Sequence, residues 1–122
     1  MHKQYRYKFY LNASHFIKIN NIPGEIHPHT WEITIDILEL QDNFNEFSNI
    51  EKIIDEIIEP FQDKLINDVA PFNETNPTLE NICEYFKNLI EQRMIEIGYL
   101  LLTIGMSETP SRSFIINLID EI

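Results

Sequence analysis

Three of the four histidines are spaced so that their side chains can bind one metal ion: His15, His27 and His29. His27 and His29 form a His-x-His pair at the start of a segment of alternating apolar residues. Because residues two positions apart on a strand share a face, both imidazoles can point at one place. His15 ends the preceding alternating segment and can bring a third nitrogen from a neighbouring strand. Three histidines with one open position are the ligand set of a catalytic zinc.

A polar loop that contains histidines by chance is the alternative to a metal site. A His-x-His pair is weak evidence by itself, because such pairs arise in many unrelated sequences. The third histidine and the alternating segments around the pair favour the metal site.

Two strands are expected to carry these histidines, because the segments beside them alternate with a period of two. Their apolar positions are Tyr5, Tyr7, Phe9 and Leu11 in the first strand and Trp31, Ile33, Ile35 and Ile37 in the second. Between the strands, residues 20–24 (NNIPG) predict a turn-rich loop.

Two helices are expected after a polar loop at residues 41–45. The first has apolar residues at helical spacing over Ile50–Phe61, and Pro60 is expected to end or kink it. The second is expected to begin at Pro77, which suits the first helical position. Cys83 falls on its apolar stripe, and we interpret this thiol as a packing group rather than a nucleophile.

Two further strands, over Ile95–Met106 and Ser113–Ile119, are expected to complete a β-β-α-α-β-β order. This order predicts one α+β domain over residues 1–122, with two helices on one face of an antiparallel sheet.

Strand parity places the three histidines at the end of the apolar face that the helices cover. The reverse face carries Arg6 and Lys8 on one strand and Glu32, Thr34 and Asp36 on the other, which can pair across strands. This face can be solvated or buried. Because a four-stranded sheet has two open edges, edge pairing between subunits would close a barrel and bury it.

The charge balance argues against nucleic acid and anionic membranes as partners. The chain has 9 basic and 20 acidic residues, a net charge of -11, whereas binding to phosphate backbones needs clustered Lys and Arg. No apolar run approaches the about 20 residues of a membrane span, and residues 1–10 lack the pattern of a signal peptide. With Cys83 as the single cysteine, we expect a cytoplasmic protein.

Four short motifs resemble those of the 6-pyruvoyl-tetrahydropterin synthases and the related bacterial 6-carboxy-tetrahydropterin synthases. In chain order they are Phe9–His15 (FYLNASH), His27–Ile33 (HPHTWEI), Asn76–Asn81 (NPTLEN) and Ser107–Thr109 (SET). The family has a strand ending in Ala-x-His, then His-Gly-His, a Pro-Thr-x-Glu-Asn helix start and a late Glu-Thr. The order of motifs and elements matches over essentially the whole chain.

The resemblance implies a tunnelling fold (T-fold), in which three subunits close a twelve-stranded barrel and two trimers stack into a hexamer. It also implies a zinc on His15, His27 and His29, with the active site at a subunit interface. Glu108 would anchor the pterin ring, because a carboxylate can accept hydrogen bonds from its amino group and adjacent N–H. Thr78 is expected to line the same pocket. Without the resemblance, Glu108 would be interpreted as a solvent-exposed carboxylate.

Two catalytic features of the family are missing at the matching positions. Residues 20–26 contain no cysteine, and the positions of the family's Asp-His pair are occupied by Gln62 and Asp63. Glu25 is the only acidic residue of the loop before His27, and it is the best candidate for a general base. An ordinary loop carboxylate is the alternative interpretation of Glu25.

Two functions of different classes remain. The first is a zinc-dependent pterin lyase or synthase that cleaves a carbon–oxygen or carbon–carbon bond, with an altered base and an altered, unphosphorylated substrate. The second is a non-catalytic protein that binds zinc and a pterin-like ring as a sensor or assembly subunit. The retained histidines and Glu108 favour the enzyme, whereas the lost cysteine and histidine favour the binding protein. In a purely structural variant, zinc would only brace the loop.

Overall fold

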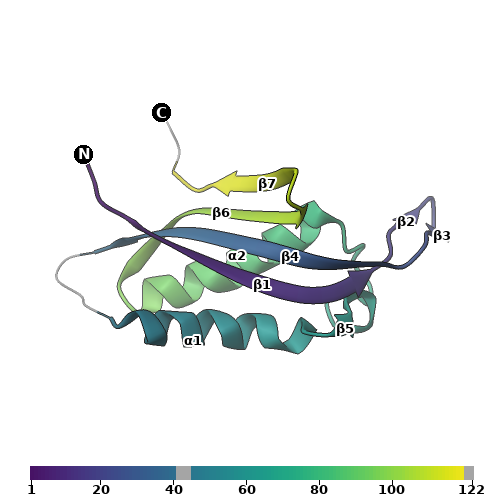
Figure 1. Cartoon of the computed structure of the whole chain (residues 1–122), viewed down its shortest axis with the longest axis horizontal. Coiled ribbons are helices and arrows are strands. Elements are labelled where there is room, and N and C mark those ends of the chain that lie inside the picture. The colour runs from purple at the N-terminus through teal and green to yellow at the C-terminus, as the bar shows by residue number, and fades with distance from the viewer. Residues whose placement is uncertain (41–44, 120–122) are drawn as a thin grey trace.

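A five-stranded sheet forms one layer of the structure, which is a computed structural model that describes residues 1–40 and 45–119. Figure 1 shows the strand order β5-β1-β4-β6-β7. The four long strands pair antiparallel, and they are β1 (Tyr5–His15), β4 (His27–Glu39), β6 (Tyr99–Thr109) and β7 (Arg112–Asn117). The short β5 (Lys64–Leu65) pairs parallel with β1 and covers part of its outer edge.

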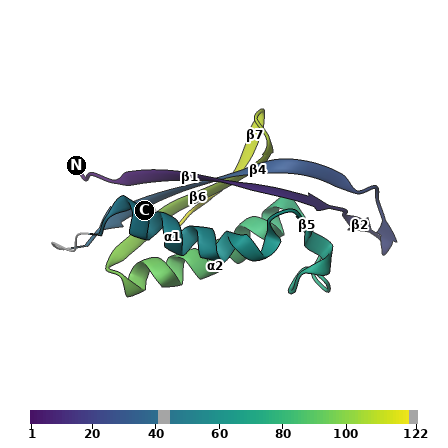
Figure 2. The same cartoon turned by 60° about the horizontal axis from the view of Figure 1, so that its bottom comes forward.

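Two helices, α1 (Phe47–Ile58) and α2 (Leu79–Glu96), cover one face of the sheet (Figure 2). The core between the layers contains the alternating residues of β1 and β4, among them Leu11, Trp31, Ile33 and Ile35. As expected, α1 ends before Pro60, where the 3₁₀ turn η1 (Glu59–Phe61) follows. The two-layer α+β architecture predicted from the sequence is confirmed.

Cys83 is fully buried on α2. Burial raises the pKa of its thiol to about 12, and the nearby Glu84 and Glu80 act in the same direction. A thiol that stays protonated and out of solvent is a poor nucleophile. The interpretation of Cys83 as a packing group is therefore confirmed.

The boundaries of the last two strands differ from the sequence prediction. The strand expected over Ile95–Met106 begins at Tyr99 and continues to Thr109. The preceding helix extends further than expected, and it stops where Gly98 adopts a left-handed φ of 86°. The final strand covers Arg112–Asn117 rather than Ser113–Ile119.

The start of α2 also differs from the prediction, because Pro77 lies just before the helix. Thr78 is the N-cap residue, and its hydroxyl oxygen accepts a hydrogen bond from the backbone N–H of Asn81 at 3.1 Å. Of the polar loop expected at 41–45, only Asn45 lies within the described residues.

A small hairpin extends beyond one end of the sheet, where β1 passes into β4 (Figure 1). It consists of β2 (Lys18–Ile19) and β3 (Ile22–Pro23), and its turn residues Asn20 and Asn21 have φ values of 54° and 63°. Asparagine tolerates this left-handed conformation better than most residues. The hairpin lets β1 and β4 pair with His15 directly opposite His27 and Ala13 opposite His29.

Candidate metal centre

His15 is buried at the end of β1 with its ring orientation fixed. The residue is 1% exposed, and its Nδ1 lies 2.8 Å from the carbonyl oxygen of Pro77. Because a carbonyl oxygen only accepts hydrogen bonds, Nδ1 carries the proton and donates it. In the neutral ring, Nε2 then presents a lone pair on the opposite side. A backbone acceptor of this kind commonly orients a metal-binding histidine.

Glu108 places a carboxylate oxygen directly against that lone pair. Its Oε2 lies 3.1 Å from His15 Nε2 and 3.4 Å from His29 Nε2. A lone pair and a carboxylate oxygen repel each other unless a proton or a metal cation lies between them. One ligand atom from each of the three residues lies within 4.8 Å of the others. The cluster His15–His29–Glu108 is therefore arranged to hold a cation.

The donor set of this cluster suits zinc. Imidazole nitrogen and carboxylate oxygen are both common zinc ligands, and tetrahedral ligand atoms about 2.0–2.1 Å from the ion lie about 3.3–3.4 Å from one another. The two distances from Glu108, 3.1 and 3.4 Å, are close to this spacing. The residues present thus fit a bound zinc ion.

His29 is partly buried, and its surroundings favour the neutral imidazole. Burial lowers the pKa of its imidazole below the usual value, the charge of Glu108 opposes this, and His15 and His27 lower the pKa further. A neutral imidazole is the form that binds a metal. The Trp31 ring packs edge-on against both His15 and His29, with centroids 4.8 and 5.1 Å apart, and limits their movement.

His27 lies outside this cluster although it belongs to the same strand face. Its side chain is exposed, and its ring centroid is 6.3 Å from that of His29. The three-histidine site therefore stays a prediction, whereas His15 and His29 are brought together with Glu108.

Glu108, predicted from the resemblance to bind the ring, lies against the histidines because of the register of β6. Ser107 pairs with Glu32 on the reverse face, so the next residue, Glu108, returns to the face of the histidines. Extending the expected third strand beyond Met106 would have revealed this placement.

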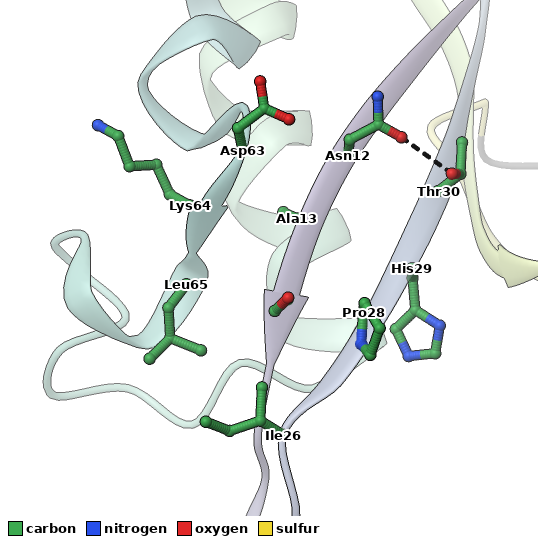
Figure 3. Close-up of a pocket in the computed structure, with 10 residues that line it drawn as sticks. Asn12, Ala13, Ile26, Pro28, His29, Thr30, Asp63, Lys64 and Leu65 are labelled. Atoms are coloured by element: carbon green, nitrogen blue, oxygen red, sulfur yellow. Dashed lines mark hydrogen bonds between the residues drawn. The ribbon is translucent and has the colours of Figure 1, made fainter.

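A cavity of about 590 Å³ borders His29 at this end of the sheet (Figure 3). Its walls combine polar and apolar side chains from β1, β4 and β5: Asn12, Ala13, Ser14, Ile26, Pro28, Thr30, Asp63, Lys64 and Leu65. The Thr30 hydroxyl donates a hydrogen bond of 2.9 Å to the Asn12 side chain and so orders one wall. The cavity is large enough for a small heterocycle.

The sequence model of the 6-pyruvoyl tetrahydropterin synthase family matches residues 4–118. The chain belongs to this family. The resemblance inferred from the four motifs is thus confirmed over almost the whole length. A comparison with curated protein sequences found no significant match.

Solved structures, two of them 6-pyruvoyl tetrahydropterin synthases, have the same fold at low sequence identity. The 6-pyruvoyl tetrahydropterin synthase of Caenorhabditis elegans aligns with a TM-score of 0.78 and 15% identity, over 94% of each chain. An uncharacterized protein of Wolinella succinogenes gives 0.71 and 13%, over 95% of this chain and 98% of that one. A catalytic-residue mutant of the Plasmodium vivax synthase, with glutamate replaced by alanine, gives 0.65 and 13%, over 95% and 99%. These likenesses support the T-fold.

Gln62, at a position where the family resemblance predicts a catalytic acid, is part of a structural contact in this chain. Its side-chain amide accepts a hydrogen bond from the backbone N–H of Asn12 and donates one to the backbone carbonyl of Tyr10. The side-chain amides of Asn67 and Asn76 bind the backbone N–H and carbonyl of Phe16 and Lys18, respectively, in the same way. They hold in place the chain that carries His15. Asp63 lines the cavity beside His29.

Thr78 and Glu25 are the other two predicted site residues. Thr78 is next in sequence to the residue that binds His15, and Glu25 is close in sequence to His27. Thr78 follows Pro77, whose carbonyl accepts from His15. Its hydroxyl oxygen caps α2 and its hydrogen can still be donated to a ligand. Glu25 is exposed in the segment between β3 and β4, two residues before His27.

Within residues 1–40 and 45–119, no helix is long and apolar enough to span a membrane.

Proposed function

We propose that this chain is a zinc-dependent pterin-processing enzyme, a lyase of the tetrahydropterin synthase type with an altered base and an altered substrate. The observation that carries the proposal is the convergence of His15, His29 and Glu108 around a fixed imidazole lone pair, with a cavity bordering His29. Membership of the 6-pyruvoyl tetrahydropterin synthase family supports pterin as the class of substrate.

Each predicted site residue has a role in this proposal. His15, His27 and His29 would hold the zinc, which would supply Lewis acidity for the hydroxyl groups of the pterin side chain. The carboxylate of Glu108 accepts hydrogen bonds from the amino group and adjacent N–H of the ring. Thr78 donates its hydroxyl hydrogen to an acceptor on the ring. The fixed ring of His15 and the packing of Trp31 keep this arrangement rigid.

Glu25 is proposed as the general base that removes a proton from the pterin side chain. It lies two residues from His27, and the loop contains no cysteine. The catalytic glutamate of the Plasmodium vivax synthase supports a carboxylate in this role. Because the chain carries a net charge of -11, we propose an unphosphorylated pterin rather than a triphosphate as substrate.

We further propose a cytoplasmic homo-oligomer, either a trimer or a hexamer, as the active form. Within residues 1–40 and 45–119, the outer edge of β1 is covered by β5 and Gln62 only in its second half, from Tyr10 onward. An uncovered strand edge is a common pairing surface between subunits. Sedimentation at micromolar concentration should give a trimer or hexamer, and a 14.5 kDa monomer would contradict this part of the proposal.

Turnover of two substrates tests the enzymatic proposal. Zinc-loaded protein should convert dihydroneopterin to a new pterin product faster than dihydroneopterin triphosphate. Glu25→Gln should abolish the conversion and leave zinc and pterin affinity nearly unchanged, because the amide keeps the shape but cannot accept the proton. Glu59→Gln, an exposed glutamate at the end of α1, is the matched control and should remain active. Full activity of Glu25→Gln would eliminate Glu25 as the base.

A non-catalytic sensor or assembly subunit is the second candidate. It is favoured by the structural use of Gln62 and by the absence of any histidine after His29 in the sequence. Tight pterin binding without turnover of either substrate would establish this candidate in place of the enzyme.

A further inference from the structure

The Pro77 carbonyl determines which nitrogen of His15 carries the proton. His15 Nδ1 donates to this carbonyl at 2.8 Å, and the contact keeps the lone pair on Nε2. In a free neutral imidazole the proton lies on either nitrogen, and the hydrogen bond made by one nitrogen decides the state of the other. The direction of the Pro77 carbonyl therefore decides whether His15 presents Nε2 to a cation.

Pro77 lies between two residues that are hydrogen-bonded to each other. Its own ring restricts its φ, and the Thr78 N–H donates to the Asn76 carbonyl at 2.9 Å, which closes a γ-turn around Pro77. The side chain of Asn81, in the first turn of α2, donates to the same Asn76 carbonyl at 2.9 Å. The direction of the Pro77 carbonyl thus depends on where Asn76 and α2 are held.

The side chain of Asn76 binds the hairpin that follows β1. Its amide accepts from the backbone N–H of Lys18 and donates to the backbone carbonyl of Lys18, both at 2.9 Å. Residues 18–23 of this hairpin are all exposed, so packing gives the hairpin little support. Asn76 therefore closes a ring of contacts, because His15 is linked to Lys18 along the chain and to Pro77 by a hydrogen bond.

We infer that Asn76 is a positioning residue of the candidate metal centre. By binding Lys18, it holds the Pro77 carbonyl against His15 Nδ1 and so keeps the lone pair on Nε2. Asn76 acts through Pro77 and does not itself bind the metal. The inference deepens the proposed function and rests on it for the role of His15.

Gln62 makes the same kind of contact at another place on β1. Its side-chain amide accepts from the N–H of Asn12 at 3.0 Å and donates to the carbonyl of Tyr10 at 2.9 Å. Removing either amide costs two hydrogen bonds to the backbone, but only Asn76 is next in sequence to Pro77. A purely structural role of Asn76 predicts equal results for the two residues, whereas a positioning role predicts that only Asn76 affects His15.

The tautomer of His15 in metal-free protein tests the inference, measured by NMR of isotope-labelled histidine nitrogens. The measurement is made at about pH 8.5, well above the ordinary imidazole pKa of about 6.5, and His15→Gln assigns the signals. The wild type and Gln62→Ala should carry the proton on Nδ1, whereas Asn76→Ala should move it to Nε2 in a large part of the population. Competition with a fluorescent chelator should show zinc binding about tenfold weaker in Asn76→Ala, and less than about twofold weaker in Gln62→Ala.

Three results would overturn the inference. The first is a wild-type His15 that is protonated on Nε2. The second is an unchanged tautomer in Asn76→Ala, with a denaturation midpoint shifted as much as in Gln62→Ala, which would make Asn76 purely structural. The third is the same tautomer change in Gln62→Ala, which would show that any loosening of β1 releases His15.

The test also separates this inference from the proposed function. Absence of zinc binding in the wild type would overturn the proposed function, whereas the tautomer is measured without metal and without substrate. If Asn76→Ala does not fold, Asn76→Asp replaces it. Its carboxylate still accepts from the Lys18 N–H but cannot donate to the Lys18 carbonyl.

Discussion

Two polar clusters lie on opposite faces of the same three strands, and only one of them is complete within the protein. On the reverse face, Asp36 is 4% exposed, and it accepts hydrogen bonds from Arg6 at 2.7 and 3.1 Å and from the Thr103 hydroxyl at 2.5 Å. On the helix-covered face, His15 and Glu108 bring a lone pair and a carboxylate together at 3.1 Å.

The difference separates a structural cluster from a functional one. Arg6 supplies the positive charge that Asp36 requires, so this cluster needs no ligand. In the other cluster, the Pro77 carbonyl uses the proton of His15 Nδ1, and the charge opposite Glu108 must come from a proton or a metal ion. A buried polar group whose charge is not balanced by the protein itself indicates a binding site.

The largest expected effect is the loss of zinc in His15→Ala. Removing the one ligand whose orientation is fixed by the backbone should weaken zinc binding by about 100-fold or more. Asp36→Asn, in the other cluster, should bind zinc like the wild type. Isothermal titration of both metal-free variants measures the contrast. Equal zinc affinities for the two variants would remove the distinction between the clusters.

Trp31→Phe should have the next largest effect, because Trp31 supports the metal centre from the core. The indole N–H donates to the Ala13 carbonyl at 3.1 Å, and the ring contacts His15 and His29. We expect a loss of about 1–3 kcal/mol in the free energy of unfolding, together with weaker zinc binding. Ile35→Val, on the same strand, is the control and should reduce stability by about 0.5–1.5 kcal/mol without changing zinc affinity. Denaturant titration and zinc competition provide the two readouts.

The Arg6–Asp36 pair should give a smaller effect, which is visible only in acid. The hydrogen bond from Arg6, with help from Thr103, holds the pKa of Asp36 below its usual value against the opposing effect of burial. The pair contributes fully to the stability of the folded protein above about pH 3.9, the pKa of an aspartate carboxyl in the unfolded chain. This contribution is lost as the pH falls through the lower pKa that Asp36 has in the folded protein.

Arg6→Met should therefore move the acid-unfolding midpoint to higher pH, as followed by circular dichroism. The shift should be modest, because the Arg6 side chain is 61% exposed and its charge is screened by solvent. Lys8→Met, two residues along the same face of β1, should move the midpoint less. Equal midpoints for the wild type and Arg6→Met would show that the pair contributes nothing measurable.

The smallest expected effect concerns Cys83, whose thiol should not react with a labelling reagent while the protein is folded. Burial raises the pKa of its thiol to about 12. We expect labelling by a thiol reagent at pH 8 only after unfolding in denaturant. Rapid labelling of the native protein would place Cys83 with the functional groups instead.

The strands and the shared face of the histidines could be predicted from local patterns. Period-two alternation in β1 and β4 fixes which side chains share a face. The pairing of the two strands then brings His15 and His29 together. The apolar positions also predict which face of the sheet the helices cover. The family could be predicted from four motifs that occur in the expected order along the chain.

The place of Glu108 against the histidines and the structural role of Gln62 could not be predicted in this way. Glu108 reaches the histidines only through the pairing of β6 with β4 and through the continuation of β6 to Thr109. The contact between His15 and Pro77 joins residues 62 positions apart. Gln62 binds the backbone of β1 fifty positions earlier in the chain, at Asn12. Such contacts depend on tertiary packing, which local sequence patterns do not encode.

Anomalous diffraction at the zinc edge, from crystals of zinc-loaded and pterin-free protein, tests the central claim most directly. We predict one peak per chain, about 2.0–2.2 Å from His15 Nε2 and His29 Nε2. A zinc-loaded crystal with no peak between these atoms would contradict the claim that this cluster is a metal centre.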